Sequence, residues 1–287
     1  MHGIVVGVSA SSVGAAALDW ALEQAALRRV SLTAVRAWDI PAYGPYYSVG
    51  SALRSTSPDH ELTELQIAQD ALAQAVQRTP GVGDVEVRAV ATRGRPPEVL
   101  VAAAQQAELL VLGTRGVGAL SRVVHLGSVS SSVLHHATGP VAIIPDTAPR
   151  PAAGPARIVV GVDGSAASLR ALSWAVAQAR LTGAVLAPLH VGGDGDGGAV
   201  AAEQEKLLAA AEAAGSGLGQ PVLVEPQVRS GHASHELIAA AATADLLVIG
   251  SRGRGGFASL LLGSTSSQVA GHATQPVVVV RPEPGGH

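Results

Sequence analysis

The amino-acid sequence repeats itself over most of its length. The segment IVVGVSASSVGAAALDWALEQA (residues 4–25) matches IVVGVDGSAASLRALSWAVAQA (residues 158–179). Farther along, AELLVLGTRG (residues 107–116) matches ADLLVIGSRG (residues 244–253). The matching segments lie 154 residues apart in the first pair (158 − 4) and 137 in the second (244 − 107). Solenoid proteins repeat with much shorter periods, of roughly 20–50 residues. The repetition therefore predicts two copies of one globular domain.

A change of composition separates the two copies. The segment DTAPRPAAGPA is rich in Pro and Ala, which is typical of a linker. We expect a first domain at residues 1–146, a linker at 147–156 and a second domain at 157–287. The first copy is longer because of WDIPAYGPYYSVGSALRSTSPDH (residues 38–60), which holds all three tyrosines of the chain. This segment could cover a site as a lid, pack on a partner, or be an irregular loop.

Each copy alternates short apolar runs with longer stretches rich in Ala and Leu. In the first copy the apolar runs include residues 4–8, 30–37 and 109–113. Strands that alternate with helices predict a parallel sheet with helices on both faces. The runs are continuously apolar, as strands covered on both sides require. The predicted fold class is α/β, with two tandem doubly wound parallel sheets of five strands each.

Composition excludes several classes of protein. The chain has no cysteine, so a disulfide framework and a thiolate zinc site are both impossible. Its net charge of −3 argues against a protein that binds nucleic acid by neutralising phosphates. No apolar run approaches the roughly 20 residues of a membrane helix. The first residues read as a strand rather than a signal peptide. We expect a cytoplasmic protein without a nucleic-acid or membrane partner.

Glycine and hydroxyl residues follow one buried run in each copy, and in the second copy they form GSRGRGGFASLLLGSTSSQV (residues 250–269). Gly250 ends the predicted strand, and Gly253 lies in the turn. Gly263, Ser264 and Thr265 begin the next predicted helix. Glycine lets backbone N–H groups approach an anion closely, and a helix N-terminus adds unpaired N–H groups and a positive dipole end. The segment therefore predicts a phosphate site.

A carboxylate stands at the end of another strand of the same copy. Asp163 follows the first apolar run of the second copy, in GVDGS. Ligands of open α/β sheets bind beyond the carboxyl ends of strands, where the strand order reverses. If the strands that precede Asp163 and Gly253 are neighbours, the carboxylate faces the same crevice. It would then suit a ribose hydroxyl or an adenine amino group.

The same residues allow less specific interpretations. Glycine-rich turns are common in α/β proteins, and Ser or Thr at a helix start is the ordinary N-cap. A P-loop is excluded because no G-x-x-x-x-G-K motif occurs and Lys206, the only lysine, lies in a helical stretch. Arg115, Arg252 and Arg254 could bind phosphate or simply lie in solvated turns. The pair of histidines at 232 and 235 could suit a metal, but no Cys or Asp follows nearby to complete the site.

These motifs resemble the universal stress protein family. The pattern of Gly, two residues, Gly, nine residues and Gly-Ser at Gly250, Gly253, Gly263 and Ser264 is similar to the nucleotide-binding signature of that family. The openings IVVGVSAS and IVVGVDGS and the closing segments HATGPVAIIP and HATQPVVVV are also similar to it. The resemblance covers nearly the whole chain, as a tandem pair. It implies the strand order 3-2-1-4-5, bound ATP with or without Mg²⁺, and adenine contacts near residues 35–37, which begin with Val35.

The first copy departs from the signature at two points. Gly113, Gly116, Gly127 and Ser128 match it, but ten residues rather than nine separate the second and third glycines. Ser9 stands where the second copy has Asp163. A hydroxyl can bond to ribose without carrying a charge. We therefore expect the second site to bind nucleotide better than the first.

The expected function is that of an ATP-binding stress-response module that acts by changing shape or partner rather than by turnover. The alternatives are a slow ATPase or nucleotidyl-transferase-like enzyme of similar fold and a nucleotide-free dimerisation module. The last runs, PVAIIP and PVVVVR, are candidate sheet edges, and bare apolar edges invite pairing. We expect these edges to pair within the chain around a local pseudo-twofold axis, which leaves a homodimer of the whole chain possible.

Overall fold

The computed structural model describes most of both predicted domains. The described residues are 3–9, 14–39, 58–114, 126–146, 155–192, 197–217, 219–253 and 262–282. The first half of the chain contains, in order, β1 (Ile4–Gly7), α1 (Ala15–Arg28), β2 (Leu32–Trp38), α3 (Pro58–Arg78), β3 (Val87–Arg93), α4 (Pro96–Ala104), β4 (Leu109–Gly113), α5 (Ser128–His136) and β5 (Val141–Ile144).

The second half repeats this order of elements. It contains β6 (Arg157–Gly161), α6 (Ala166–Thr182), β7 (Val185–Gly192), α7 (Gly197–Gly215), β8 (Gln227–Ser230), α8 (Ala233–Ala241), β9 (Leu246–Gly250), α9 (Ser264–His272) and β10 (Val277–Val280). The alternation of strands and helices predicted from the sequence is therefore confirmed in both copies.

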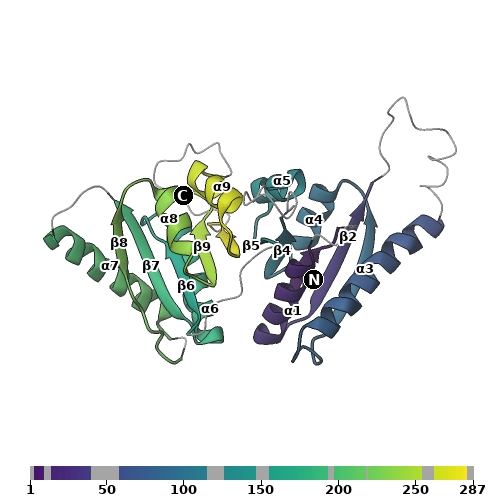
Figure 1. Cartoon of the computed structure of the whole chain (residues 1–287), viewed down its shortest axis with the longest axis horizontal. Coiled ribbons are helices and arrows are strands. Elements are labelled where there is room, and N and C mark those ends of the chain that lie inside the picture. Colours follow the sequence, from purple (N-terminus) through teal and green to yellow (C-terminus); the bar gives the residue numbers. More distant parts are fainter. Residues whose placement is uncertain are drawn as a thin grey trace.

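In the part of the chain that the structure describes, all ten strands belong to one sheet, in the order β3-β2-β1-β4-β5-β10-β9-β6-β7-β8. Figure 1 shows the two halves of the chain side by side. Each half is parallel and has the order 3-2-1-4-5 when its own strands are counted. The halves join where β5 and β10 pair antiparallel, with Val278 opposite Ala142. The predicted pairing of the two last strands is confirmed, and it merges the two predicted sheets into one. β3 and β8 are left as the outer strands.

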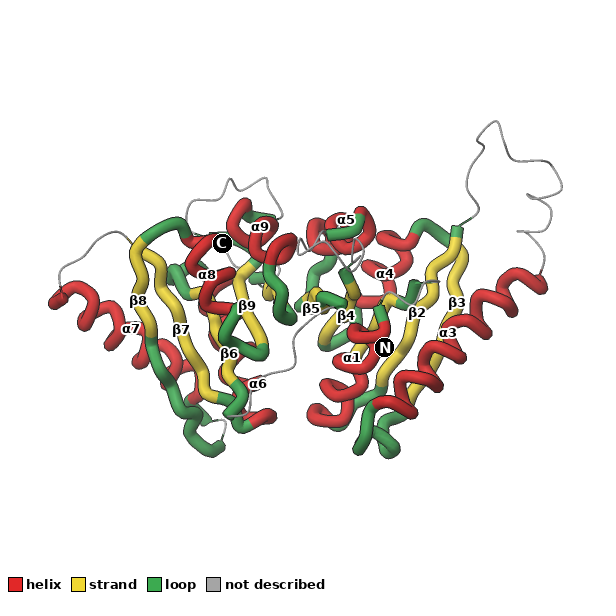
Figure 2. Tube along the Cα trace, in the orientation of Figure 1, coloured by secondary structure: helices red, strands yellow, loops and turns green. Residues whose placement is uncertain are grey.

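The strands are buried because helices cover both faces of the sheet (Figure 2). Successive residues of a strand point to opposite faces. In β10, Val278 and Val280 belong to the core beneath α1, α3, α6 and α7, whereas Val277 and Val279 belong to the core beneath α4, α5, α8 and α9. All four are at most 3% exposed. Each core runs through both halves, so the halves share their apolar interior.

The first helix of each half ends in the same left-handed backbone conformation, but a different residue adopts it. α6 ends at Gly183, whose φ of 68° is left-handed, the usual backbone conformation after a helix. α1 ends at Arg29 with a φ of 56°, the only positive φ of a non-glycine residue in the described part of the chain. Left-handed backbone costs an L-residue roughly 1–2 kcal/mol. The first copy therefore carries local strain that the second copy avoids.

Two equivalent glutamines meet between the halves. Gln178 in α6 donates from Nε2 to Oε1 of Gln24 in α1 at 2.9 Å, and both side chains are buried. Arg28 donates to Oε1 of Gln178, and its guanidinium lies 5.1 Å from the ring centre of Trp174. Burial lowers the pKa of Arg28, while the carboxylate of Glu108 raises it. The interface thus combines a central amide pair with a cation that stacks on an indole.

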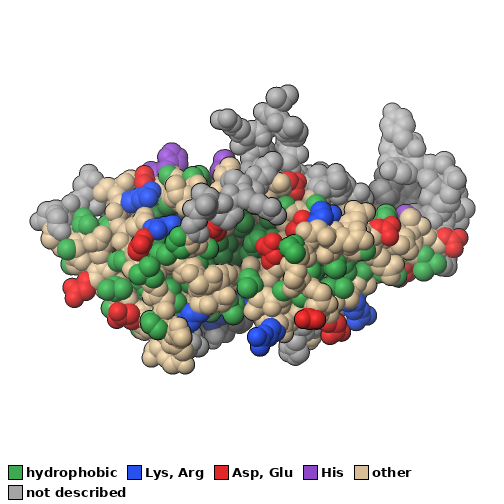
Figure 3. Space-filling view, turned by 60° about the horizontal axis from the view of Figure 1, so that its bottom comes forward, with side chains coloured by type: hydrophobic (Ala, Val, Ile, Leu, Met, Phe, Trp, Pro, Cys, Tyr) green, Lys and Arg blue, Asp and Glu red, His purple; other side chains and the backbone are tan. Residues whose placement is uncertain are grey.

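On the face that Figure 3 shows, acidic and basic side chains are interspersed rather than separated by sign. In the part of the chain that the structure describes, no helix has both the length and the apolar character needed to cross a membrane.

Candidate functional site

Each half has one cavity where its strands end. The first cavity has a volume of about 440 Å³ and the second about 410 Å³. Both lie at the carboxyl ends of the first, second and fourth strands of their half, which is where open α/β sheets bind ligands. The predicted residues that line the first cavity are Ser9, Val35, Gly113, Gly127 and Ser128. Those that line the second are Asp163, Gly250, Gly253, Gly263, Ser264 and Thr265.

One predicted site residue and two segments lie outside the described residues. Gly116 belongs to the glycine stretch of the first copy, at a position that the structure does not describe. The same holds for residues 254–261 of the second glycine stretch and for the tyrosine-rich residues 40–57. The contribution of Gly116 to the first site and the role of the tyrosines therefore stay predictions.

A helix N-terminus faces each cavity beyond the glycine strand. α5 begins at Ser128 after Gly127, and α9 begins at Ser264 after Gly263. Neither helix has a side-chain cap, whereas Ser165 caps α6 by accepting from the N–H of Ser168. An uncapped first turn leaves backbone N–H groups that an anion can bind, at the positive end of the helix dipole.

The serine at the third position of each of these helices is bonded to the preceding strand. In the second copy, Oγ of Ser266 donates to the carbonyl of Gly250 at 2.8 Å. Ser130, its counterpart in the first copy, donates to the carbonyl of Gly113 at 3.2 Å. These serines tie the third residue of the helix to the end of the strand. Each of these serines lines its cavity together with the two residues before it, so the bond to the strand holds this part of the lining in position.

The first glycine of the motif has a packing role. A Cβ on Gly250 would lie 2.7 Å from the carbonyl carbon of Ala167 and 2.8 Å from the nitrogen of Ser168. A Cβ on Gly113 would lie 3.1 Å from Cα of Gly14. Both strands therefore approach the backbone of the helix that follows the first strand of their half. This glycine permits close strand–helix packing, which sequence reasoning had attributed to the anion.

Asp163 occupies the space beside the second glycine. Oδ2 of Asp163 lies 2.5 Å from the place where a Cβ on Gly253 would be. Oδ1 of Asp163 accepts from the N–H of Ser165 at 3.0 Å. The strand that precedes Asp163 is hydrogen-bonded to the glycine strand, as expected for one crevice. The carboxylate is thus held between the turn after β6 and the turn after β9, at the edge of the cavity.

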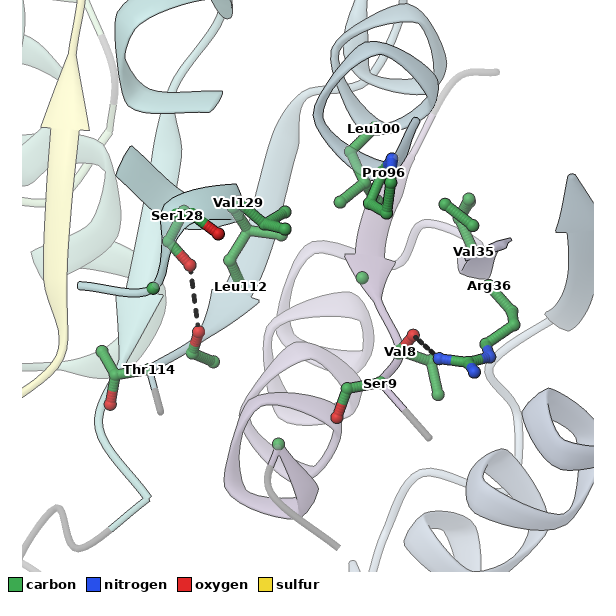
Figure 4. Close-up of a pocket in the computed structure, with 16 residues that line it drawn as sticks. Val8, Ser9, Val35, Arg36, Pro96, Leu100, Leu112, Thr114, Ser128 and Val129 are labelled. Carbon is green, nitrogen blue, oxygen red and sulfur yellow. Dashed lines mark hydrogen bonds between the residues drawn. The ribbon is translucent and has the colours of Figure 1, made fainter. Parts of the chain in front are cut away.

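Arg36 lies within residues 35–37, which were predicted to contact adenine, but no role was predicted for its side chain. Arg36 lines the cavity beside Val35, and its Nη1 donates to the carbonyl of Val8 at 3.3 Å (Figure 4). Its Nε donates to Oε2 of Glu64 at 2.7 Å, and both side chains are mostly buried. In the second half His190 is its counterpart, with Nδ1 2.8 Å from the carbonyl oxygen of Val162. Only the repeat alignment could have identified this pair.

Helices α4 and α8 supply apolar cover for the cavities. Pro96 and Leu100 of α4 project toward the first cavity (Figure 4), and Leu237 of α8 lines the second. Such walls, with a few polar groups at one end, are typical of sites for small molecules that have an apolar ring. No motif indicated these residues, because they come from helices whose sequence reads as ordinary amphipathic core.

The other candidates from the sequence differ in where they lie, and two of them, Arg115 and Arg254, are outside the described residues. Lys206 pairs with Glu203 at 3.0 Å on the exposed side of α7 and lines neither cavity. Arg252 does line the second cavity. The rings of His232 and His235 lie 6.1 Å apart, and no cluster of three or more metal-ligating side chains occurs among the described residues.

Known proteins resemble this chain over both halves. The model of the Universal stress protein family matches residues 1–145 and 155–281. A universal stress protein of Mycolicibacterium smegmatis is 38% identical over 299 residues, which cover 98% of this chain and 97% of that protein. One from Mycobacterium tuberculosis is 33% identical over 302 residues, covering 97% and 95%. The crystal structure of a universal stress protein from Archaeoglobus fulgidus has a TM-score of 0.69 at 22% identity and covers 99% of this chain and 97% of its own, which shows a shared fold.

Proposed function

Because the chain belongs to the universal stress protein family, we propose that it is a regulatory module that binds ATP in the two cavities. ATP acts as a ligand that changes the shape or the partner of the protein and is not consumed rapidly. The observation that carries the proposal is the uncapped N-terminus of α9, beside a cavity whose rim also holds the carboxylate of Asp163.

The two ends of each cavity suit the two ends of a nucleotide. Cavities of about 440 and 410 Å³ fall within the roughly 300–1,000 Å³ of small-molecule sites. In the second cavity, backbone N–H groups at Ser264 and Thr265 hold phosphate, and Asp163 accepts from the ribose hydroxyls. In the first cavity, the backbone N–H at Ser128 holds phosphate, Ser9 bonds to the ribose hydroxyls, and adenine lies near Val35.

The N-termini of α5 and α9 are expected to bind phosphate without promoting its transfer. Fast phosphoryl transfer requires positive charge at the transition state, a metal held by carboxylates and a group that orients the nucleophile. Residues 113–133 and 250–269 contain no Asp, Glu or Lys. N–H donors that bind ground state and transition state alike do not raise the turnover rate. We expect hydrolysis far slower than the roughly 1–10³ s⁻¹ of ordinary enzymes.

Release of nucleotide from the purified full-length chain tests this function directly. Protein is denatured, and the released small molecules are identified and counted per chain by mass spectrometry. Protein stripped of nucleotide is then titrated with ATP by calorimetry and incubated with radiolabelled ATP and Mg²⁺. We expect one or two ATP per chain and persistent bound ATP. Absence of nucleotide and of ATP binding contradicts the proposal, and so does turnover near one per second that Gly263→Asp abolishes.

A further inference from the structure

The two cavities differ at the position that faces the ribose in the proposed function. Ser9 and Asp163 both follow the first strand of their half and line equivalent places in the two cavities. A serine offers one hydroxyl that both donates and accepts, whereas an ionised aspartate only accepts. The two copies therefore present opposite hydrogen-bonding requirements to the same part of a ligand.

The carboxylate of the second cavity is anchored through one oxygen. Asp163 accepts from the N–H of Ser165 through Oδ1, and its Oδ2 lies 2.5 Å from where a Cβ on Gly253 would be. The second cavity thus carries a carboxylate on its rim, beside Gly253.

No carboxylate replaces this charge among the described residues that line the first cavity. The only charged side chain of that lining is Arg36, which pairs with Glu64. Asp146 comes near, because its Oδ1 accepts from the N–H of Gly14 at 3.0 Å. Gly14 lines the first cavity, so the carboxylate of Asp146 lies one hydrogen bond from that lining without belonging to it. The position that aligns with Asp163 is Ser9, and Asp146 comes from the end of the chain's fifth strand instead.

Chemistry at a ribose 3′-oxygen distinguishes the two arrangements. A free 3′-hydroxyl donates a hydrogen bond to a carboxylate, and such charge-assisted bonds are short and strong. A 3′-phosphate has no hydroxyl to donate and brings negative charge against the carboxylate, which is unfavourable at close range. A serine hydroxyl donates to a phosphate oxygen as readily as it accepts from a ribose hydroxyl.

We propose that the two sites select different classes of adenine nucleotide, an inference that rests on the proposed function. The second site requires a ribose with free hydroxyls because of Asp163. The first site also takes a nucleotide whose ribose 3′-oxygen carries phosphate, because Ser9 stands in place of the acid. One chain thereby binds two classes of nucleotide, and Ser9 and Asp163 are the residues that determine which class each site accepts.

The test uses full-length chains in which one site is weakened at a time. Gly263→Asp weakens the second site so that binding to the first can be fitted separately, and Gly127→Asp weakens the first so that binding to the second can be fitted. Each chain is titrated by calorimetry with ADP and with ADP phosphorylated at the 3′-oxygen, a pair that differs only in that phosphate. We expect the second site to bind the 3′-phosphorylated compound at least ten-fold more weakly than ADP. The first site is expected to bind the two compounds within about three-fold of each other.

Exchange of the two side chains supplies the decisive comparison. In the second site, Asp163→Ser and the isosteric Asp163→Asn should both remove the discrimination, because charge rather than shape causes it. In the first site, Ser9→Asp should introduce it. Thermal unfolding confirms that each variant is folded. Equal discrimination by both unmodified sites, or discrimination that survives Asp163→Asn and Asp163→Ser, overturns this inference alone. Failure of ATP and ADP to bind at either site overturns the proposed function with it.

Discussion

Replacement of Gly253 by alanine is expected to weaken nucleotide binding while leaving the fold nearly unchanged. A Cβ there has one close neighbour, Oδ2 of Asp163 at 2.5 Å, which is the far end of a flexible side chain. The φ of Gly253 lies outside the left-handed range, so alanine fits the backbone. Replacing glycine at such a position gains about 0.4–1 kcal/mol through the unfolded state, and displacing the carboxylate costs a similar amount. The free energy of unfolding should therefore change by less than about 1 kcal/mol.

The binding effect of Gly253→Ala follows from the displaced carboxylate. A hydrogen bond to a charged group contributes about 1.5–3 kcal/mol, and each 1.4 kcal/mol is a factor of ten in affinity. ATP affinity of the second site should fall roughly ten-fold or more. Calorimetry with ATP measures this, and urea unfolding measures stability. In an Asp163→Ser background the same glycine substitution should have no further effect, because no carboxylate remains to be displaced.

Gly250→Ala, three positions earlier, is the matched control. Its Cβ would meet the backbone at Ala167 and Ser168 within 2.8 Å, and backbone cannot rotate away. Such overpacking costs about 1–3 kcal/mol of stability. The reasoning is refuted if Gly250→Ala is as stable as the natural chain. It is refuted equally if Gly253→Ala weakens ATP binding to the same extent with and without Asp163.

Three further outcomes are expected. Gly263→Asp should lower ATP affinity about ten-fold or more in calorimetry, and by more than Gly127→Asp does. The fold should persist, because aspartate is a good N-cap residue for α9 and its Cβ would meet only ordinary contacts of 3.5 Å and longer. Arg29→Gly should raise the free energy of unfolding in urea by about 0.5–1 kcal/mol by relieving the left-handed strain, and an unchanged midpoint speaks against that strain. Residues 1–150 alone should sediment as a homodimer through β5, and a well-behaved monomer contradicts the importance of that edge.

The fold could be predicted because its determinants are local and repeated. Continuous Val, Ile and Leu runs indicated buried parallel strands, and β5 and β10 are indeed buried along their whole length. The duplication made the pairing of two equivalent edges a natural expectation. The strand order came from the family resemblance, since nothing in either copy alone distinguishes 3-2-1-4-5 from other doubly wound orders.

Most predicted site residues line the cavities because strand ends and helix starts can be recognised in sequence. What could not be predicted depends on contacts between distant segments. Arg36 reaches Val8 and Glu64, each 28 residues away, and its role at the first cavity has no local signature. The close contact of Gly250 with Ala167, and the return of Ser266 to the strand carbonyl, likewise exist only after helices and sheet have packed.

The meeting of Gln24 and Gln178 at equivalent places in the two copies has a consequence for how such a protein can evolve. A residue on a symmetry axis faces its own counterpart, so in a dimer of identical subunits any mutation there is made twice at one spot. A single gene that encodes both halves removes this restriction. Arg28 occurs once, against Trp174, while the corresponding position in the second copy is Thr182. Because the halves are covalently joined, this asymmetric match also persists at dilutions where separate subunits would part.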